Sequence, residues 1–418
     1  MLGCMLTTTT STRCRLPGGR PFHLLLLGLA TSSLGDWLYN VALLALVFGR
    51  TGSPTWVALT TAARVLPVVV LGPLGGVVAD RVDRRALMVG ADAVRLVLMV
   101  ALATVAATEL PILLAPVLAA AATAASTVAM PSVAASTPRL VDASELQRAN
   151  ALRSAIGQGA IVAGPALGAV VLALSDPAVA ILLNGLSFAV SAVCVLAIGP
   201  GPAFAPRDGQ GGELPSLLDD LRAGARALRG APTAVRLVAA DVLCSGVYGL
   251  LTVMLMLVSR QVGAGSGGYG ILLGAFGAGG LLGATLVARA DAPATWRRVL
   301  AVALMLVAAS MAALGQSSTL VEALSLAVLG GGGMIVGEVL SETALPRMLD
   351  DEVLGRAYGL AVPTSIGGIV VGSLVAGPLV SLLGLHGAFI AAGVFVAVVA
   401  AVLLRRPLTV APVRAAMA

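Results

Sequence analysis

The chain has 418 residues, of which 58% are hydrophobic and 11% charged, and its mean hydropathy is +1.00. No soluble globular domain approaches these values, so the composition indicates an integral membrane protein. All 26 basic residues are arginine, and they fall in short loops rather than in one patch. The net charge of +6 therefore reflects membrane topology and not nucleic-acid binding.

The N-terminal region resembles a secretory signal at first, because Arg13, Arg15 and Arg20 precede an apolar run. That run is long enough to span a membrane and lacks a small-residue cleavage site after a short core, so we expect a retained first helix. Hydropathy predicts twelve segments long enough to cross a hydrocarbon core of ~30 Å. They are residues 22–48, 54–79, 86–107, 111–136, 150–173, 177–199, 233–259, 268–288, 299–316, 320–343, 357–383 and 387–404.

The loop arginines predict the orientation of these spans. With the N-terminus inside, the outer loops hold only Arg50 and Arg260, so both termini are expected to be cytoplasmic. In the widest polar break, Ser216 can cap a short helix in which Arg222 and Arg226 lie beside a leucine stripe. It is either an amphipathic helix on the inner membrane surface or a solvated linker helix. The expected organisation is a tail (1–20), a six-helix bundle (21–199), a linker (200–232), a second six-helix bundle (233–404) and a tail (405–418).

The two halves repeat each other at an offset of 208 residues. The segment LQRANAL at 146–152 matches LGRAYGL at 354–360. Gly72, Gly75 and Arg81 match Gly280, Gly283 and Arg289, whereas Asp80 corresponds to Ala288. Such a repeat predicts two bundles related by a pseudo-twofold axis, with the acidic residue kept only in the first.

The loop after the second span reads GPLGGVVADRVDRR over residues 72–85. It resembles the cytoplasmic signature loop of the major facilitator superfamily, although Asp83 replaces a family glycine. Because Asp tolerates a left-handed backbone, we expect the tight turn to survive. Helix-dipole physics and the resemblance imply that Asp80 accepts bonds from the N-terminal backbone of helix 11, near Arg356, and so latches the outward-facing state. The alternative is an ordinary basic turn. The signature residues are Gly76, Ala79, Asp80, Arg81, Arg84 and Arg85.

The resemblance covers nearly the whole chain and looks closest to the branch that contains macrolide-efflux proteins and the enterobactin exporter. It is also carried by residues 35–37, residues 63–67 and Gly355-Arg356. In the fifth span, Gly164, Pro165 and Gly168 resemble the core of the antiporter signature, while two flanking family glycines are Ala160 and Ala169. The resemblance therefore implies two bundles that rock around a central site, and it supports antiport without deciding it.

Asp36 lies in the middle of the first span, with Ser32 and Asn40 one turn to either side. An ionisable group inside a membrane is costly, so we expect this face to line a wet cavity. Arg64 lies at a similar depth, which predicts an Asp36–Arg64 ion pair. Burial favours the protonated carboxyl group and arginine favours the ionised one, so the pair is a candidate for proton coupling. The alternative is a permanent structural pair.

In the second half, Asp241, Ser245 and Tyr248 share a face of the seventh span, and Glu338 lies at a similar depth in the tenth. The resemblance implies that helices 1, 4, 7 and 10 line the cavity, so we expect an acidic pocket with few aromatic residues. It would attract a cationic substrate or a proton. The alternative is that Glu338 or Glu342 bonds an arginine at the cytoplasmic rim, which we favour for Glu342.

Asp92 and Arg95 are i, i+3 neighbours near the inner end of the third span, and we interpret them as structural. No catalytic triad, phosphate loop, dinucleotide fingerprint or metal-ligand spacing is found, so we expect neither an enzyme nor a cofactor. The sequence predicts an all-α major facilitator fold and a monomeric exporter of amphipathic small molecules, driven by proton antiport in a bacterial cytoplasmic membrane. The alternatives are a siderophore or other metabolite exporter, or a uniporter.

Overall fold

The computed structural model describes residues 17–206, 222, 226, 232–287, 293–348 and 351–405, and among them every regular element is helical. The predicted linker helix lies outside these residues except for Arg222 and Arg226. The long helices are α1 (Arg20–Thr51), α2 (Pro54–Arg81), α3 (Arg84–Ala107), α4 (Leu114–Leu140), α5 (Leu146–Leu174), α6 (Pro177–Ile198), α8 (Pro232–Gln261), α9 (Gly265–Val287), α10 (Pro293–Leu314), α11 (Leu320–Met348) and α12 (Asp351–Leu403). One 3-10 turn, Ala143–Glu145, precedes α5.

The twelve predicted spans agree with this arrangement. Eleven helices of the described residues are long and apolar enough to cross a membrane. The longest, α12, is interrupted at Gly384, whose φ of 69° and ψ of 173° are not helical. A positive φ costs glycine little, so the chain turns there and α12 supplies two spans. The predicted break between residues 383 and 387 is confirmed.

The turn between α2 and α3 forms for a different reason from the one predicted. Asp83 has φ −55° and ψ 117°, which is not a left-handed conformation. Its carboxylate instead accepts a hydrogen bond of 2.8 Å from the backbone N–H of Ala86 and caps α3. An aspartate at this position satisfies a donor that would otherwise be unpaired at the start of the helix.

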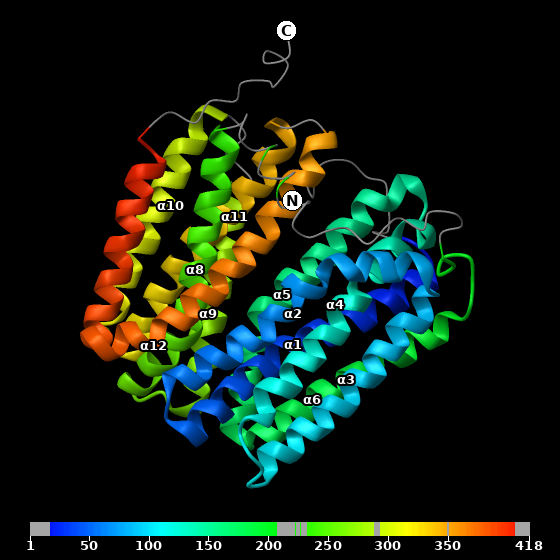
Figure 1. Cartoon of the computed structure of the whole chain (residues 1–418), viewed down its shortest axis with the longest axis horizontal. Coiled ribbons are helices and arrows are strands. Elements are labelled where there is room, and N and C mark those ends of the chain that lie inside the picture. The colour runs from blue at the N-terminus through cyan, green and yellow to red at the C-terminus, as the bar shows by residue number, and fades with distance from the viewer. Residues whose placement is uncertain are drawn as a thin grey trace, which may run out of the picture.

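The helices pack as two bundles, α1–α6 and α8–α12 (Figure 1). In the first bundle α1 packs on α5 and α6, α2 on α4, and α3 on α6. In the second, α8 and α10 pack on α12, and α9 on α11. The repeated glycines account for part of this symmetry: a Cβ at Gly75 would lie 2.7 Å from the carbonyl oxygen of Thr127 in α4, and one at Gly283 would clash with Gly332 in α11. Small residues let membrane helices approach closely.

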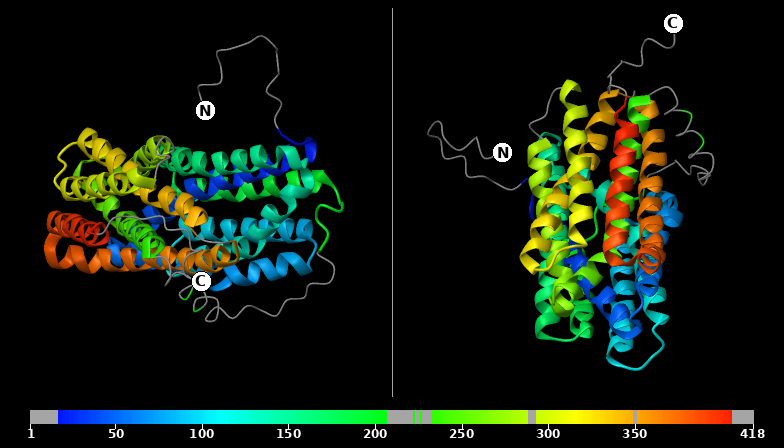
Figure 2. Two further views of the ribbon diagram at one scale, coloured as in Figure 1. Left: turned by 90° about the horizontal axis from the view of Figure 1, so that it is seen from above. Right: turned by 90° about the vertical axis from the view of Figure 1, so that its left-hand side faces the viewer.

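The bundles meet mainly through α5 with α9 and through α2 with α12. A Cβ at Gly270 of α9 would lie 2.7 Å from the carbonyl oxygen of Pro165 of α5, and one at Gly377 of α12 would lie 3.2 Å from Oγ1 of Thr55 of α2. These contacts lie toward the end of the molecule that carries Arg50 and Arg260. Toward the opposite end, called here the arginine-rich end, the bundles diverge (Figure 1). Figure 2 shows the same helices from above and from one side.

Candidate functional site

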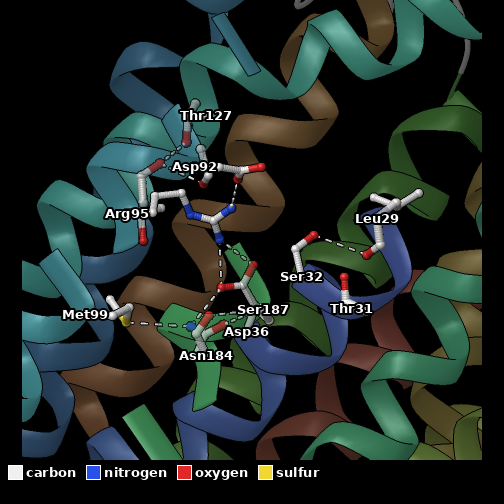
Figure 3. A network of polar contacts seen from close by, with 12 residues as sticks. Leu29, Thr31, Ser32, Asp36, Asp92, Arg95, Met99, Thr127, Asn184 and Ser187 are labelled. Atoms are coloured by element: carbon white, nitrogen blue, oxygen red, sulfur yellow. Dashed lines mark hydrogen bonds and ion pairs between the residues drawn. The ribbon is translucent and has the colours of Figure 1, made fainter. Parts of the chain in front are cut away.

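Asp36 forms an ion pair, but with Arg95 of α3 and not with Arg64 as predicted. A terminal nitrogen of Arg95 lies 2.8 Å from one carboxylate oxygen of Asp36 and 2.6 Å from the other (Figure 3). The side-chain amide of Asn184 in α6 donates to the first oxygen at 3.4 Å. Depth along the helices alone could not select the partner, because it does not reveal which neighbour faces α1 at Asp36.

Arg95 also joins Asp36 to a second acid. Its other terminal nitrogen lies 3.6 Å from a carboxylate oxygen of Asp92, and its guanidinium carbon lies 3.7 Å from the ring centroid of Phe188. Asp92 and Arg95 are each 8% exposed. The structural interpretation of this pair was therefore incomplete, since two carboxylates share one guanidinium, an arrangement that we call the Asp36–Arg95–Asp92 triad.

Arg64 of α2 instead hydrogen-bonds the side-chain oxygen of Asn40, which is buried, and its guanidinium lies 5.7 Å from the centroid of the Tyr39 ring. The depth predicted for Arg64 was correct to within one helical turn, since its partner Asn40 is one turn from Asp36 on α1. Both Asp36 and Arg64 line a cavity of about 390 Å³ in the first bundle. Ser32 lines an adjoining cavity with Asp36, and its hydroxyl donates to the carbonyl of Leu29 at 3.2 Å.

The second bundle contributes most of a cavity of about 340 Å³. Asp241, Ser245, Tyr248 and Glu338 all line it, as the sequence predicted. Asp241 accepts a hydrogen bond from the hydroxyl of Ser365 in α12, a partner that nothing in the sequence indicated. No arginine is among the described residues that line this cavity. The side chains together form the acidic pocket that the resemblance implied.

Glu342 lines the same cavity and a second one, of about 410 Å³, that it shares with Asp36. The side chains of Arg347 and Arg356, which follow toward the end of α11 and the start of α12, lie outside the described residues. The predicted arginine partner of Glu342 therefore stays a prediction.

The expectation of a cavity poor in aromatic residues was wrong. Trp37, Tyr248, Phe276 and Tyr358 all line the 340 Å³ cavity. They come from α1, α8, α9 and α12, so no local pattern could have brought them together. Helices α5, α9 and α12 contribute to its wall as well as α1, α8 and α11, which the resemblance implied as helices 1, 7 and 10. The fourth implied helix, α4, lines the cavity of about 390 Å³ instead.

The antiporter-like segment holds α5 against α1. A Cβ at Gly164 would clash with the Cβ of Trp37, and one at Gly168 would lie 2.8 Å from the carbonyl oxygen of Leu38. Between them, the carbonyl of Pro165 faces α9 at the contact between the bundles. These residues therefore permit close packing at the centre of the molecule.

The expected latch is not formed by the described residues, in which Asp80 pairs instead with Arg84 at 3.2 Å. The physical reason is the divergence of the bundles at the arginine-rich end, which separates α2 from the start of α12 there. Arg84 is buried and also donates to the carbonyl of Ala79 at 3.1 Å. Arg85 donates to the carbonyls of Val195 and Leu196 at the end of α6. Of the other predicted latch residues, Gly76 has open space where a Cβ would lie, Arg81 is exposed, and the side chain of Arg356 is outside the described residues.

Comparisons with known proteins agree with this architecture. A family model described as "Transmembrane secretion effector" matches residues 20–417. The MFS-type transporter YfiS of Bacillus subtilis is 29% identical over 233 residues, which are 56% of this chain and 52% of that protein. Macrolide efflux protein A of Streptococcus pyogenes is 24% identical over 42% of this chain and 43% of its own length. The chain thus aligns with only about half of each of these relatives.

The fold is also found in solved structures. A bacterial homologue of the human lysosomal transporter Spinster, solved in an inward-facing and unoccupied conformation, superimposes with a TM-score of 0.68 at 13% identity, over 92% of this chain and 96% of the other. At this identity the likeness concerns the fold alone. Together with the family match, it defines a transporter rather than an enzyme. The chain belongs to the transmembrane secretion effector family of major facilitator transporters.

Proposed function

We propose that the protein exports amphipathic small molecules from the cytoplasm by proton antiport, with alternating access of a central site. The observation that carries this proposal is the placement of ionisable side chains from both bundles on cavities inside the molecule. These cavities lie between the arginine-rich end and the end that carries Arg50 and Arg260, where the bundles are in contact, called here the closed end. Membrane-buried charges are costly, and they are typical of substrate and proton pathways. The partial similarity to macrolide efflux protein A supports the direction of transport.

The distribution of arginines supports the orientation. Arg50 and Arg260 lie at the closed end, and the loops of the other end carry most of the remaining arginines. By the positive-inside rule the arginine-rich end is cytoplasmic, so the conformation is inward-facing. An exporter loads its substrate from the cytoplasm in this state.

The triad is the proposed proton site. When all three of its side chains are ionised, Asp36 and Asp92 carry one negative charge more than Arg95 can neutralise. Binding of one proton makes the group electrically neutral, which favours its burial when the bundles rock. Arg95 thus takes the role that the sequence suggested for Arg64.

The acidic cavity of the second bundle is the proposed substrate site. Asp241 and Glu338 line it without a described arginine, so it favours a substrate that carries a positive charge. At ~4 Å two unit charges interact by about 4 kcal/mol at an effective dielectric constant of 20, which is enough to discriminate strongly against anions.

The test uses purified protein in liposomes, with the cation tetraphenylphosphonium as the transported probe. A pH gradient is imposed so that the lumen is more acidic than the outer solution, which contacts the side of the protein that corresponds to the cytoplasm. Wild-type protein is expected to concentrate the probe, and Asp36→Asn is expected to abolish gradient-driven accumulation while retaining probe binding. A control variant, Asp83→Asn, keeps a helix-capping side chain and is expected to transport normally.

Three outcomes would contradict the proposal. Accumulation by Asp36→Asn at the wild-type rate would move the proton site away from the triad. Equilibration of the probe faster than in protein-free liposomes, without any response to the pH gradient, would favour the uniporter. No transport of the cationic probe by the wild-type protein would favour a siderophore or other metabolite exporter.

A further inference from the structure

Aromatic side chains gather at one place in a chain that has few of them. Phe, Trp and Tyr make up 3% of the sequence, yet four line the 340 Å³ cavity. Tyr248 and Phe276 form a tilted pair with ring centroids 6.5 Å apart. Tyr358 lines the wall on α12, and its hydroxyl donates to the carbonyl of Glu342 at 3.3 Å. Packing of apolar helices alone does not require this concentration of rings.

Carboxylates lie among these rings. Asp241 and Glu338 line the same cavity, and the chain contains no lysine that could neutralise them. The described partner of Asp241 is the neutral Ser365. Ring faces carry partial negative charge and attract cations within about 6 Å. Rings and carboxylates in one cavity therefore provide the chemistry that recognises an organic cation.

Trp37 connects this cavity to the first bundle. It lines the aromatic cavity, the cavity shared by Asp36 and Glu342, and the cavity that contains Arg64 and Arg95. Among the aromatic residues of the described wall it is the one supplied by α1–α6. It also directly follows Asp36 in the chain. A substrate in contact with Trp37 would therefore touch the bundle that holds the proposed proton site.

Gly164 fixes the position of Trp37. Because a Cβ at residue 164 would clash with the Cβ of Trp37, the backbone of α5 lies directly against the base of this side chain. The next glycine of the segment, Gly168, packs against the carbonyl of Leu38 and not against Trp37. The antiporter-like segment thus contains one glycine that supports the tryptophan and one that serves the same helix contact without touching it.

We propose that the cavity binds organic cations that carry aromatic rings, and that Trp37, supported by Gly164, is the ring through which the first bundle contacts them. This substrate class rests on the proposed transport function. The binding test below needs neither a gradient nor transport, so the two can fail separately.

The probes are three ions that differ in their aromatic rings and in the sign of their charge, so the effect of each property on binding can be measured separately. Tetraphenylphosphonium is an aromatic cation, tetraphenylborate is an anion of nearly the same shape, and tetrabutylammonium is a cation without rings. Binding to detergent-purified protein is measured by equilibrium dialysis. Tetraphenylphosphonium is expected to bind saturably and at least about tenfold more tightly than either of the other two, since it alone uses both rings and carboxylates.

Tryptophan fluorescence locates the bound probe. The chain has 3 Trp, so replacement of Trp56 and Trp296 by Phe leaves Trp37 as the only reporter. Tetraphenylphosphonium is expected to change the Trp37 emission with the same midpoint as in dialysis. A saturable probe that leaves this emission unchanged would overturn the assignment of Trp37.

The variants separate ring contact from helix packing. Trp37→Ala is expected to weaken tetraphenylphosphonium binding by roughly tenfold and tetrabutylammonium binding much less, whereas the conservative Trp37→Phe keeps most of the affinity. Gly164→Ala is expected to resemble Trp37→Ala, and Gly168→Ala is the matched control at the same helix contact. Equal losses for both glycine variants, or equal losses for all three probes, would mean that these residues only pack the helices and would overturn the proposal. Trp37→Phe keeps the test decisive if a glycine variant does not fold.

Discussion

Arg95 shows how one side chain can organise charges from several helices. It bonds Asp36 of α1, lies within ion-pair distance of Asp92 on its own helix, and stacks on Phe188 of α6. Asp36 keeps 39% of its side-chain surface exposed, whereas the Arg95 side chain keeps 10%. The guanidinium is therefore held within the first bundle, while the carboxylate faces the cavity and remains accessible to water and protons.

The two arginines of this bundle should differ in their contribution to stability. Arg95→Gln leaves two acids without their cation, so we expect the free energy of unfolding to fall by about 3 kcal/mol. Arg64→Gln loses a hydrogen bond to the neutral Asn40, so we expect a loss of about 1 kcal/mol. Unfolding in mixed detergent, followed by circular dichroism, measures both.

A second substitution provides the control for the first variant. Asp36→Asn combined with Arg95→Gln removes one uncompensated charge and is expected to recover part of the lost stability. Equal destabilisation by Arg95→Gln and Arg64→Gln would show that the triad is not the main electrostatic element of the bundle.

At the scale of elements, the contact between α5 and α9 holds the closed end together. It is built from backbone that approaches backbone, with Gly270 beside the carbonyl of Pro165 and Gly267 beside that of Ala169. Such a contact tolerates little added volume, because closely packed helices leave no space for even one additional methyl group between them. The same segment that resembles the antiporter signature thus takes part in closing the molecule.

Gly270→Ala is expected to open this end. The new Cβ would lie 2.7 Å from the carbonyl oxygen of Pro165, and overpacking of this kind costs about 1–3 kcal/mol. That cost shifts the equilibrium toward the other conformation by at least about fivefold. Spin labels on Ser53 and Gly263, in a background without native cysteines, should report longer distances between the two bundles.

Gly274→Ala is the matched control on the same face of α9. Its Cβ would lie 3.5 Å from Ala166, an ordinary van der Waals contact. Its distance distribution should match the wild type. A shift of the same size in both variants would mean that any added methyl group on α9 disturbs the contact, and that Gly270 has no particular role in closure.

At the scale of the whole molecule, the two bundles are joined at one end and separate at the other (Figure 1). Asp80 lies at the end where they separate and pairs with Arg84 of its own bundle. Rocking of the bundles would bring the start of α12 toward α2, where the backbone N–H groups of α12 can donate to the carboxylate of Asp80. The Asp80–Arg84 pair is therefore the arrangement expected when the proposed latch is open.

Asp80→Asn is expected to increase the population of the conformation described here. An interaction between a carboxylate and a helix N-terminus is worth about 0.3–1 kcal/mol, which corresponds to a shift of roughly twofold to fivefold. Cysteine accessibility at the arginine-rich end should rise and transport should fall, with expression unchanged. Asp83→Asn removes the same charge from the same loop without touching the latch, and an equal shift in that variant would exclude the latch.

The sequence by itself determined the features that depend on local composition. The membrane class, the number of spans, the two-fold repeat and the break near Gly384 all follow from hydropathy and spacing, because a helix in lipid must satisfy its backbone internally and cover a fixed thickness. The acidic face of α8 and the depth of Glu338 could also be predicted, since helical periodicity fixes which residues share a face.

Only the tertiary structure decided which side chains meet. Asp36 pairs with Arg95 rather than Arg64 because α3, and not α2, places its guanidinium beside that carboxylate. The depth of a residue along its helix does not reveal how the helix is rotated or which helix lies next to it. Trp37, Tyr248, Phe276 and Tyr358 share one cavity although they are scattered over four helices. Periodicity acts within one helix, whereas the contacts that form a site act between helices, so the site could be assembled only from the packed molecule.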